Sequence, residues 1–363
     1  MKHTPLILAP IALVYAAATV TANVDTPPEP ISADHIEAPA SNSSDERFAE
    51  TFSLDQAVHF ADNAAMDWQD TRRCVTCHTN GWYLATRSAA GADAPAYRDA
   101  RDFAEDYLNR YVVDGEQPRG QHGSAEGLVA TTAFKAISDI QTTGQLDEST
   151  KLALDHIWTL QDDSGAWVQW LKCHWGPFEA DDHFGVTLVA LAMGLASGDT
   201  YVQTPAAAAG IAKLRAYLDA HPPSNLHQAG MMLWASMYLA GLADDEARHG
   251  WMAELLDAQR DDGGWALVDL GGGDWVREDG GAQDDFSDAY ATAFVAWVLI
   301  ESGQPRDGEH LAQAIDWLKT HQRESGRWYT RSPRRDRRHF ISHAATNFAL
   351  LVLAEDAAED ARP

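Results

Sequence analysis

The sequence contains one cysteine motif whose spacing predicts covalent attachment of a haem. In Cys74-Val-Thr-Cys77-His78, two thiols stand three positions apart and an imidazole follows at once. Thiols at this spacing can bond to the two vinyl groups on one edge of a porphyrin, and the adjacent histidine then lies under the iron. We therefore expect one haem c, attached through Cys74 and Cys77, with His78 as the proximal iron ligand.

Other interpretations of this motif stay open. Cys74 and Cys77 can instead form a short-loop disulfide, or they can join Cys173 and a histidine, His78 or His174, in a zinc site. The match can also be accidental, but three cysteines in 363 residues do not make a disulfide scaffold. The sequence does not assign the sixth iron ligand, for which the candidates are His59, His122, His174, His183, His339, His343, Met66 and Met193.

A second candidate site is the acidic cluster Glu179-Ala-Asp181-Asp182, which precedes the apolar stretch HFGVTLVALA. A carboxylic acid that is kept protonated and aimed into a dry cavity can protonate an alkene or an epoxide. The same cluster also suits the start of a helix, because Asp181 and Asp182 would complement the helix dipole.

A further acidic run, DDFSD at residues 284–288, matches the sequence pattern of a motif that binds magnesium diphosphate. Helix capping explains this run better than diphosphate binding. Ser287 is expected as the N-cap, and Asp288 is expected in the first turn of the helix that follows.

The elements that must position these groups are helices. Between residues 51 and 355 the apolar residues recur with helical periodicity, and no convincing strand alternation is found. About twelve helical segments pair into about six antiparallel hairpins. The sequence therefore predicts an all-α domain, a single (α/α)6 toroid over residues 51–355. Residues 23–50 are expected to form a disordered linker, and residues 356–363 an acidic tail.

An internal repeat, Gln-x-x-x-Gly-x-Trp, supports this arrangement. Each copy is expected to end one helix, with glycine in a left-handed conformation, glutamine bonded to backbone groups and tryptophan packed on a neighbouring helix. The three copies are Gln161, Gly165 and Trp167; Gln259, Gly263 and Trp265; and Gln322, Gly326 and Trp328.

This pattern resembles the QW repeat of squalene-hopene cyclases, oxidosqualene cyclases and related α/α-toroid proteins. The segments DGGWALVDLGGGDWVREDG, SDAYATAF and HFISHAATNFALLVLA are similar to the C-terminal part of that superfamily. Together with CVTCHTNGWYLATRSA, they resemble exported bacterial cyclase-like proteins that carry Cys-x-x-Cys-His. The resemblance implies that Glu179, Asp181 and Asp182 match the Asp-x-Asp-Asp motif of class II terpene cyclases, with Asp181 as the general acid and Glu179 replacing the first aspartate.

The N-terminus predicts export. Lys2 and His3 precede an apolar stretch at residues 6–20, and small residues at Val20 and Ala22 favour cleavage after Ala22. Residues 1–22 are thus expected to be a signal peptide, and the mature chain to be periplasmic or otherwise extracytoplasmic. No other apolar run approaches the ~20 residues of a membrane span. The net charge of -27 argues against nucleic acid as a partner.

Three functions are compatible with these features. The first, favoured by the cysteine motif and the signal peptide, is an extracytoplasmic haem protein that transfers electrons to a redox partner protein or acts in a redox-linked process. The second is a single-toroid enzyme related to terpene cyclases that uses Asp181 as acid, with Glu179 and Asp182 tuning it. The third is a non-catalytic scaffold whose inner ring binds an apolar small molecule or a partner. The sequence does not decide whether the chain is an enzyme.

Overall fold

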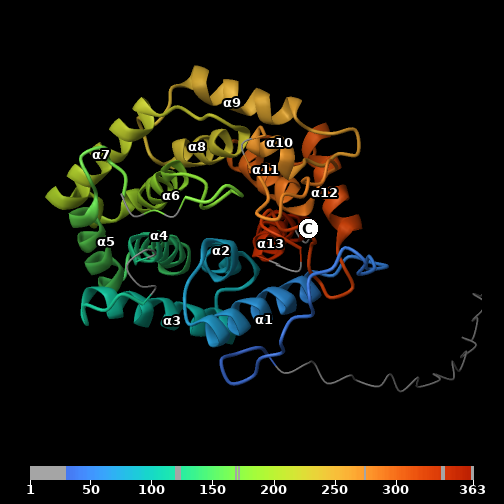
Figure 1. Cartoon of the computed structure of the whole chain (residues 1–363), viewed down its shortest axis with the longest axis horizontal. Coiled ribbons are helices and arrows are strands. Elements are labelled where there is room, and N and C mark those ends of the chain that lie inside the picture. The colour runs from blue at the N-terminus through green and yellow to red at the C-terminus, as the bar shows by residue number, and fades with distance from the viewer. Residues whose placement is uncertain are drawn as a thin grey trace, which may run out of the picture.

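Helical hairpins form two concentric rings around a common axis (Figure 1). The computed structural model describes residues 30–118, 124–167, 170, 172–273, 275–336 and 340–360. The outer ring consists of α1 (Leu54–Arg72), α3 (Pro95–Val112), α5 (Glu148–Leu160), α7 (Pro205–Ala220), α9 (Asp245–Asp257) and α12 (Glu309–His321). The inner ring consists of α2 (Trp82–Thr86), α4 (Ser124–Thr143), α6 (Asp182–Leu195), α8 (Leu226–Tyr238), α11 (Ala289–Glu301) and α13 (Phe340–Asp360).

The inner ring is closed. Each inner helix contacts the next one along the chain, and α13 contacts α2. A further short helix, α10 (Leu267–Gly271), lies in the connection between α9 and α11. Within the described residues the only β-pairing is two isolated bridges, Ser32 with His35 and Phe48 with Arg323. The predicted all-α toroid is therefore confirmed.

The inner and outer helices differ in sequence because they are buried differently. In α11 every residue from 289 to 299 is buried, and in α6 every residue from 183 to 194 is buried. A helix that is apolar all round belongs in an interior, and small residues such as alanine let such helices approach one another. The outer helix α3, in contrast, buries one face only, through residues such as Tyr97, Leu108 and Tyr111. None of the described helices has the length and apolar character needed to cross a bilayer.

Aromatic side chains fill the axis of the inner ring. Trp82 lies among them, with its ring centroid 4.6 Å from that of Phe348 and stacked at 5.9 Å on Trp234. Side chains therefore occupy this part of the axis, where the scaffold hypothesis placed an apolar ligand. Each inner helix contributes to this aromatic plug, which consists of Trp82, Phe134, Phe184, Trp234, Phe294 and Phe348.

The three repeat copies form the same turn. The glutamine amide donates to the glycine carbonyl of its own copy, at 2.9, 2.8 and 3.1 Å. The tryptophan indole donates to a carbonyl ten residues earlier, on Ile157, Leu255 and Leu318. All three glycines have positive φ values, between 86° and 96°, as the sequence predicted.

Each repeat turn also binds the next outer helix. The same glutamine amides donate to backbone carbonyls of Gly210 in α7, His310 in α12 and Ser53 at the start of α1. The third of these bonds, from Gln322 to Ser53, joins the last hairpin to the first. The repeat therefore closes the outer ring as well as ending helices.

Residues 30–50 correct the prediction of a disordered linker over 23–50. This segment, the strap, lies against the third repeat turn: the backbone N–H of Ala49 donates to the Gln322 carbonyl at 2.8 Å. The guanidinium of Arg327, only 1% exposed, donates to the carbonyls of Ala40 and Ser41. Since a buried guanidinium requires acceptors, the strap is part of the fold. Residues 23–29 and the predicted signal peptide lie outside the described residues.

The C-terminal boundary also differs from the sequence prediction. Helix α13 continues to Asp360, so most of the predicted tail over residues 356–363 is helical. Residues 361–363 are outside the part of the chain that the structure describes.

Replacing Gly326 by alanine tests the role of the third repeat turn. A Cβ at Gly326 would lie 2.1 Å from the carbonyl oxygen of Gln56 in α1, and φ is +92°. We expect Gly326→Ala to lower the free energy of unfolding by about 3 kcal/mol. The matched control is Gly303→Ala, where φ is +84° but no atom lies within 4 Å, so about 1 kcal/mol is expected. Denaturant unfolding measures both variants, and equal losses would contradict the proposed close contact.

Candidate functional site

The candidate motifs all lie at one end of the toroid. Because the hairpins are antiparallel, every connection from an outer helix to an inner helix leaves the rings at the same end, here called the loop end. The cysteine motif lies between α1 and α2, the cluster at 179–182 between α5 and α6, and the run at 284–288 between α9 and α11. Two cavities at this end are each lined by residues from several of these connections.

The backbone of the cysteine motif is held by its own polar side chains. Helix α1 ends at Arg72, and its C-cap, Arg73, has a left-handed conformation with φ of 53°. The Asn80 side chain accepts from the Thr76 N–H at 3.0 Å and donates to the Cys74 carbonyl at 3.1 Å. Position 81 requires glycine, because a Cβ there would lie 2.6 Å from the Phe134 ring. The turn therefore has one defined backbone path into α2.

The three functional side chains of the motif have different surroundings. Cys77 is 1% exposed, whereas Cys74 and His78 are partly buried. The imidazole of His78 meets the Trp68 ring edge to face, with centroids 5.2 Å apart. His78 also lines a cavity of about 160 Å³, here called the His78 cavity, whose other lining residues are Cys173, Trp175, Gly176, Pro177, Phe178, Glu179, Ser332, Pro333, Arg334 and Ile341.

The zinc alternative receives little support from this arrangement. Within the described residues, no three histidine, cysteine, aspartate or glutamate side chains come close enough together to hold a metal ion. Burial, with a further contribution from the Glu179 carboxylate, raises the pKa of Cys173 to about 11. Cys173 is therefore a thiol at neutral pH in the metal-free protein, whereas zinc binds the thiolate.

The sixth-ligand candidates are dispersed. His122 and His339 lie outside the described residues. None of the other candidates lines the His78 cavity: His59, His174, His183, His343, Met66 and Met193.

The carboxylates of the 179–182 cluster have separate contacts. Asp181 is the N-cap of α6: one oxygen accepts from the His183 N–H at 2.8 Å and the other accepts from the Gln228 amide at 2.7 Å. Asp182 pairs with Lys172 at 2.8 Å, and Glu179 lines the His78 cavity. The capping interpretation of Asp181 is confirmed, while its role as a general acid stays a prediction.

The run at 284–288 corrects one detail of the capping prediction. The N-cap of α11 is Asp288, not Ser287, and its carboxylate accepts from the backbone N–H groups of Tyr290, Ala291 and Leu267. Burial raises the pKa of Asp288 to about 6, although these donors act in the opposite direction. The Ser287 hydroxyl instead donates to Asp262 at 2.6 Å. Serine and aspartate are both good caps, so the sequence could not separate them.

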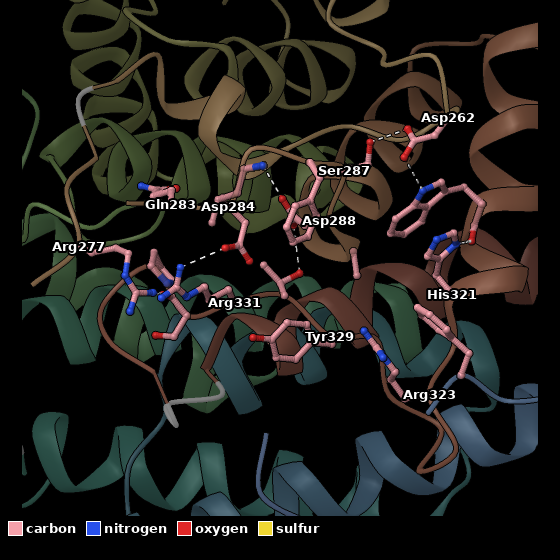
Figure 2. A pocket seen from close by; sticks show the side chains of 18 residues that line it. Asp262, Arg277, Gln283, Asp284, Ser287, Asp288, His321, Arg323, Tyr329 and Arg331 are labelled. Carbon is pink, nitrogen blue, oxygen red and sulfur yellow. Dashed lines mark hydrogen bonds and ion pairs between the residues drawn. The ribbon is translucent and has the colours of Figure 1, made fainter. Parts of the chain in front are cut away.

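Sequence reasoning missed a second cavity at the loop end. It has a volume of about 240 Å³ and lies between the segments that follow the second and third repeat copies (Figure 2). The sequence does contain a signal for this cavity. The second and third repeat copies belong to neighbouring hairpins, and each copy precedes a long connection.

Comparisons with known proteins agree with the fold. No family model matches the chain, and the search of curated proteins finds no match. Among solved structures, a glycosidase variant has a TM-score of 0.56 at 14% identity, with 84% of this chain and 97% of that chain covered. A glycosidase variant in complex with glucose has a TM-score of 0.54 at the same identity and coverage.

The terpene cyclases align less closely. The apo type II terpene cyclase MstE from Scytonema has a TM-score of 0.49 at 15% identity, with 84% of this chain and 99% of that chain covered. At 14% identity, the likeness to the glycosidase structures concerns the fold alone.

Substitution of Asp181 tests the capping role. Asp181→Ala removes the acceptor for the His183 N–H and for the Gln228 amide, so we expect a loss of about 1 to 2 kcal/mol in the free energy of unfolding. Asp181→Asn keeps one acceptor oxygen and serves as the matched control, with a smaller loss. Thermal and denaturant unfolding measure both variants. If both variants were as stable as the wild type, Asp181 would not stabilise α6.

Proposed function

We propose that this chain is an extracytoplasmic c-type haem protein that transfers electrons or acts in a redox-linked process. The observation that carries the proposal is the position of the motif at residues 74–78. Its backbone path is defined at the loop end of the toroid, and His78 lines a cavity whose walls include Trp175, Phe178 and Ile341. The predicted signal peptide supports export, which is where covalent haem attachment takes place.

The residues present fit a covalently attached haem in their chemistry. Two thiols and one imidazole form the required donor set, and Trp175, Phe178 and Ile341 provide apolar surface beside His78. The cavity of about 160 Å³ is smaller than the roughly 300–1,000 Å³ of a typical cofactor pocket. It therefore encloses only part of a group of this size. Covalent attachment makes deeper enclosure of the haem unnecessary, because two thioether bonds prevent its dissociation.

Each residue of the site has a defined task in this proposal. Cys74 and Cys77 hold the group, and His78 ligates its iron. The Trp68 ring restricts the orientation of the His78 imidazole through the contact at 5.2 Å. Trp175, Phe178 and Ile341 provide apolar contact beside the imidazole, while Glu179 and Arg334 make the rest of the same lining polar. When bound, the haem supplies one-electron chemistry at a potential set by its ligands and surroundings.

The two alternative functions receive less support. Asp181 uses its carboxylate oxygens to cap α6 and to bind Gln228, and the aromatic plug occupies the axis of the inner ring. Neither observation supplies the dry cavity beside a protonated acid that alkene protonation requires.

Cysteine substitutions separate haem attachment from effects on folding. The protein is expressed with a cytochrome c maturation system, and its visible absorption is measured before and after acid–acetone extraction. The wild type and Cys173→Ser should retain the haem spectrum after extraction, because Cys173 is not part of the motif. The double variant Cys74→Ser, Cys77→Ser should lose covalent attachment, since neither thioether bond can form.

Two results would contradict the proposal. One is a colourless wild type when a control cytochrome matured in the same cells is coloured. The other is equal retention of haem by the double variant and the wild type after extraction.

A further inference from the structure

The second loop-end cavity has a volume of about 240 Å³, and charged, polar and aromatic side chains line it. We call it the α11 cavity, because Ser287, Asp288 and Ala289 at the start of α11 form part of its wall. Figure 2 shows carboxylates, guanidinium groups and aromatic rings around it. Ser332 and Pro333 contribute to both this cavity and the His78 cavity, so the two are neighbours at the loop end.

The charges in the α11 cavity are paired with one another or with nearby groups. Asp284 accepts from Arg331 at 3.1 Å, and Arg277 pairs with Asp279. The Arg323 guanidinium lies 4.1 Å above the Phe48 ring. Asp262 accepts from the Ser287 hydroxyl and the Trp317 indole. Because cationic and anionic groups alternate and neutralise each other, the cavity does not select a strongly charged ligand.

Hydrogen-bond acceptors in the lining have capacity left for a ligand. The Gln283 side-chain oxygen is buried and has no hydrogen-bond partner among the described residues, while its amide donates to the Trp275 carbonyl at 2.7 Å. Nδ1 of His321 lies 2.7 Å from the Trp317 carbonyl, which can only accept. Nδ1 therefore carries the proton and Nε2 is an acceptor. Burial lowers the pKa of His321, so the ring is neutral at pH 7.

Two exposed phenyl rings belong to the lining of the same cavity. Phe286 is 57% exposed and Phe48 is 49% exposed, and Tyr329 and Trp317 also line the cavity. Exposed large apolar groups that gather at a cavity are typical of ligand sites. The cavity volume corresponds to about eight water molecules, at roughly 30 Å³ for each.

A ligand that matches this lining is neutral, has apolar ring faces, and carries hydroxyl groups at its edge that both donate and accept. We propose that the α11 cavity binds one ring of a neutral saccharide, with its faces against the phenyl rings and its hydroxyl groups on the polar lining. In this arrangement Phe286 contacts the sugar face, and the Gln283 oxygen accepts from a hydroxyl group. The proposal is independent of haem attachment, because none of its residues belongs to the cysteine motif.

Calorimetric titration of the full mature chain tests this proposal. The probes are glucose, galactose, mannose, xylose and N-acetylglucosamine with their short oligomers, and inorganic phosphate as the charged competitor. At least one saccharide should bind saturably. Phe286→Ala should weaken that binding by about tenfold, since it removes most of one stacked face. Gln283→Leu should also weaken it by about tenfold, through the lost acceptor.

Leu152→Ala is the matched control, because Leu152 is 53% exposed on α5 and does not line the cavity. It should bind as the wild type does, and circular dichroism of all three variants checks their folding. The proposal is overturned if no saccharide in the panel binds. It is also overturned if both cavity variants, when folded, bind as tightly as the wild type, or if phosphate binds to the cavity in preference to every saccharide.

Discussion

The hydrogen bonds from the repeat glutamines to the next outer helix hold this molecule in a ring. The third copy is the decisive one, since Gln322 binds the Ser53 carbonyl and joins hairpins that are far apart in sequence. Gly326 permits this contact because any side chain there would collide with the Gln56 carbonyl. The strap adds to the same junction through Arg327 and Ala49. Together with the packing of α13 on α2, this closure fixes the connections at the loop end relative to one another.

The antiparallel order of the hairpins explains how distant motifs come to share one end. The cysteine motif, the 179–182 cluster and the 284–288 run belong to different hairpins, yet all lie in outer-to-inner connections. The aromatic plug fills the axis, so the cavities for a ligand lie among these connections rather than inside the inner ring. A toroid of this kind fixes where chemistry can take place, but it does not select the chemistry.

Local patterns in the sequence predicted the parts of the structure that depend on neighbouring residues. The helical periodicity, the three repeat turns and the Asp181 cap all follow from such patterns. The strap was missed because its polar composition looks disordered, and its partner Arg327 lies far along the chain. The α11 cavity was missed because Asp262, Phe286 and Tyr329 come from two neighbouring connections, and no local pattern predicts how these connections pack on each other.

The intact mass of the denatured protein tests whether residues 74–78 hold a haem on this toroid. The protein is purified from cells that contain an active cytochrome c maturation system and is then measured by mass spectrometry under denaturing conditions. The expected result is the mass of the polypeptide without residues 1–22 plus one haem. A mass equal to the polypeptide alone, with a control cytochrome from the same cells carrying its haem, would contradict it.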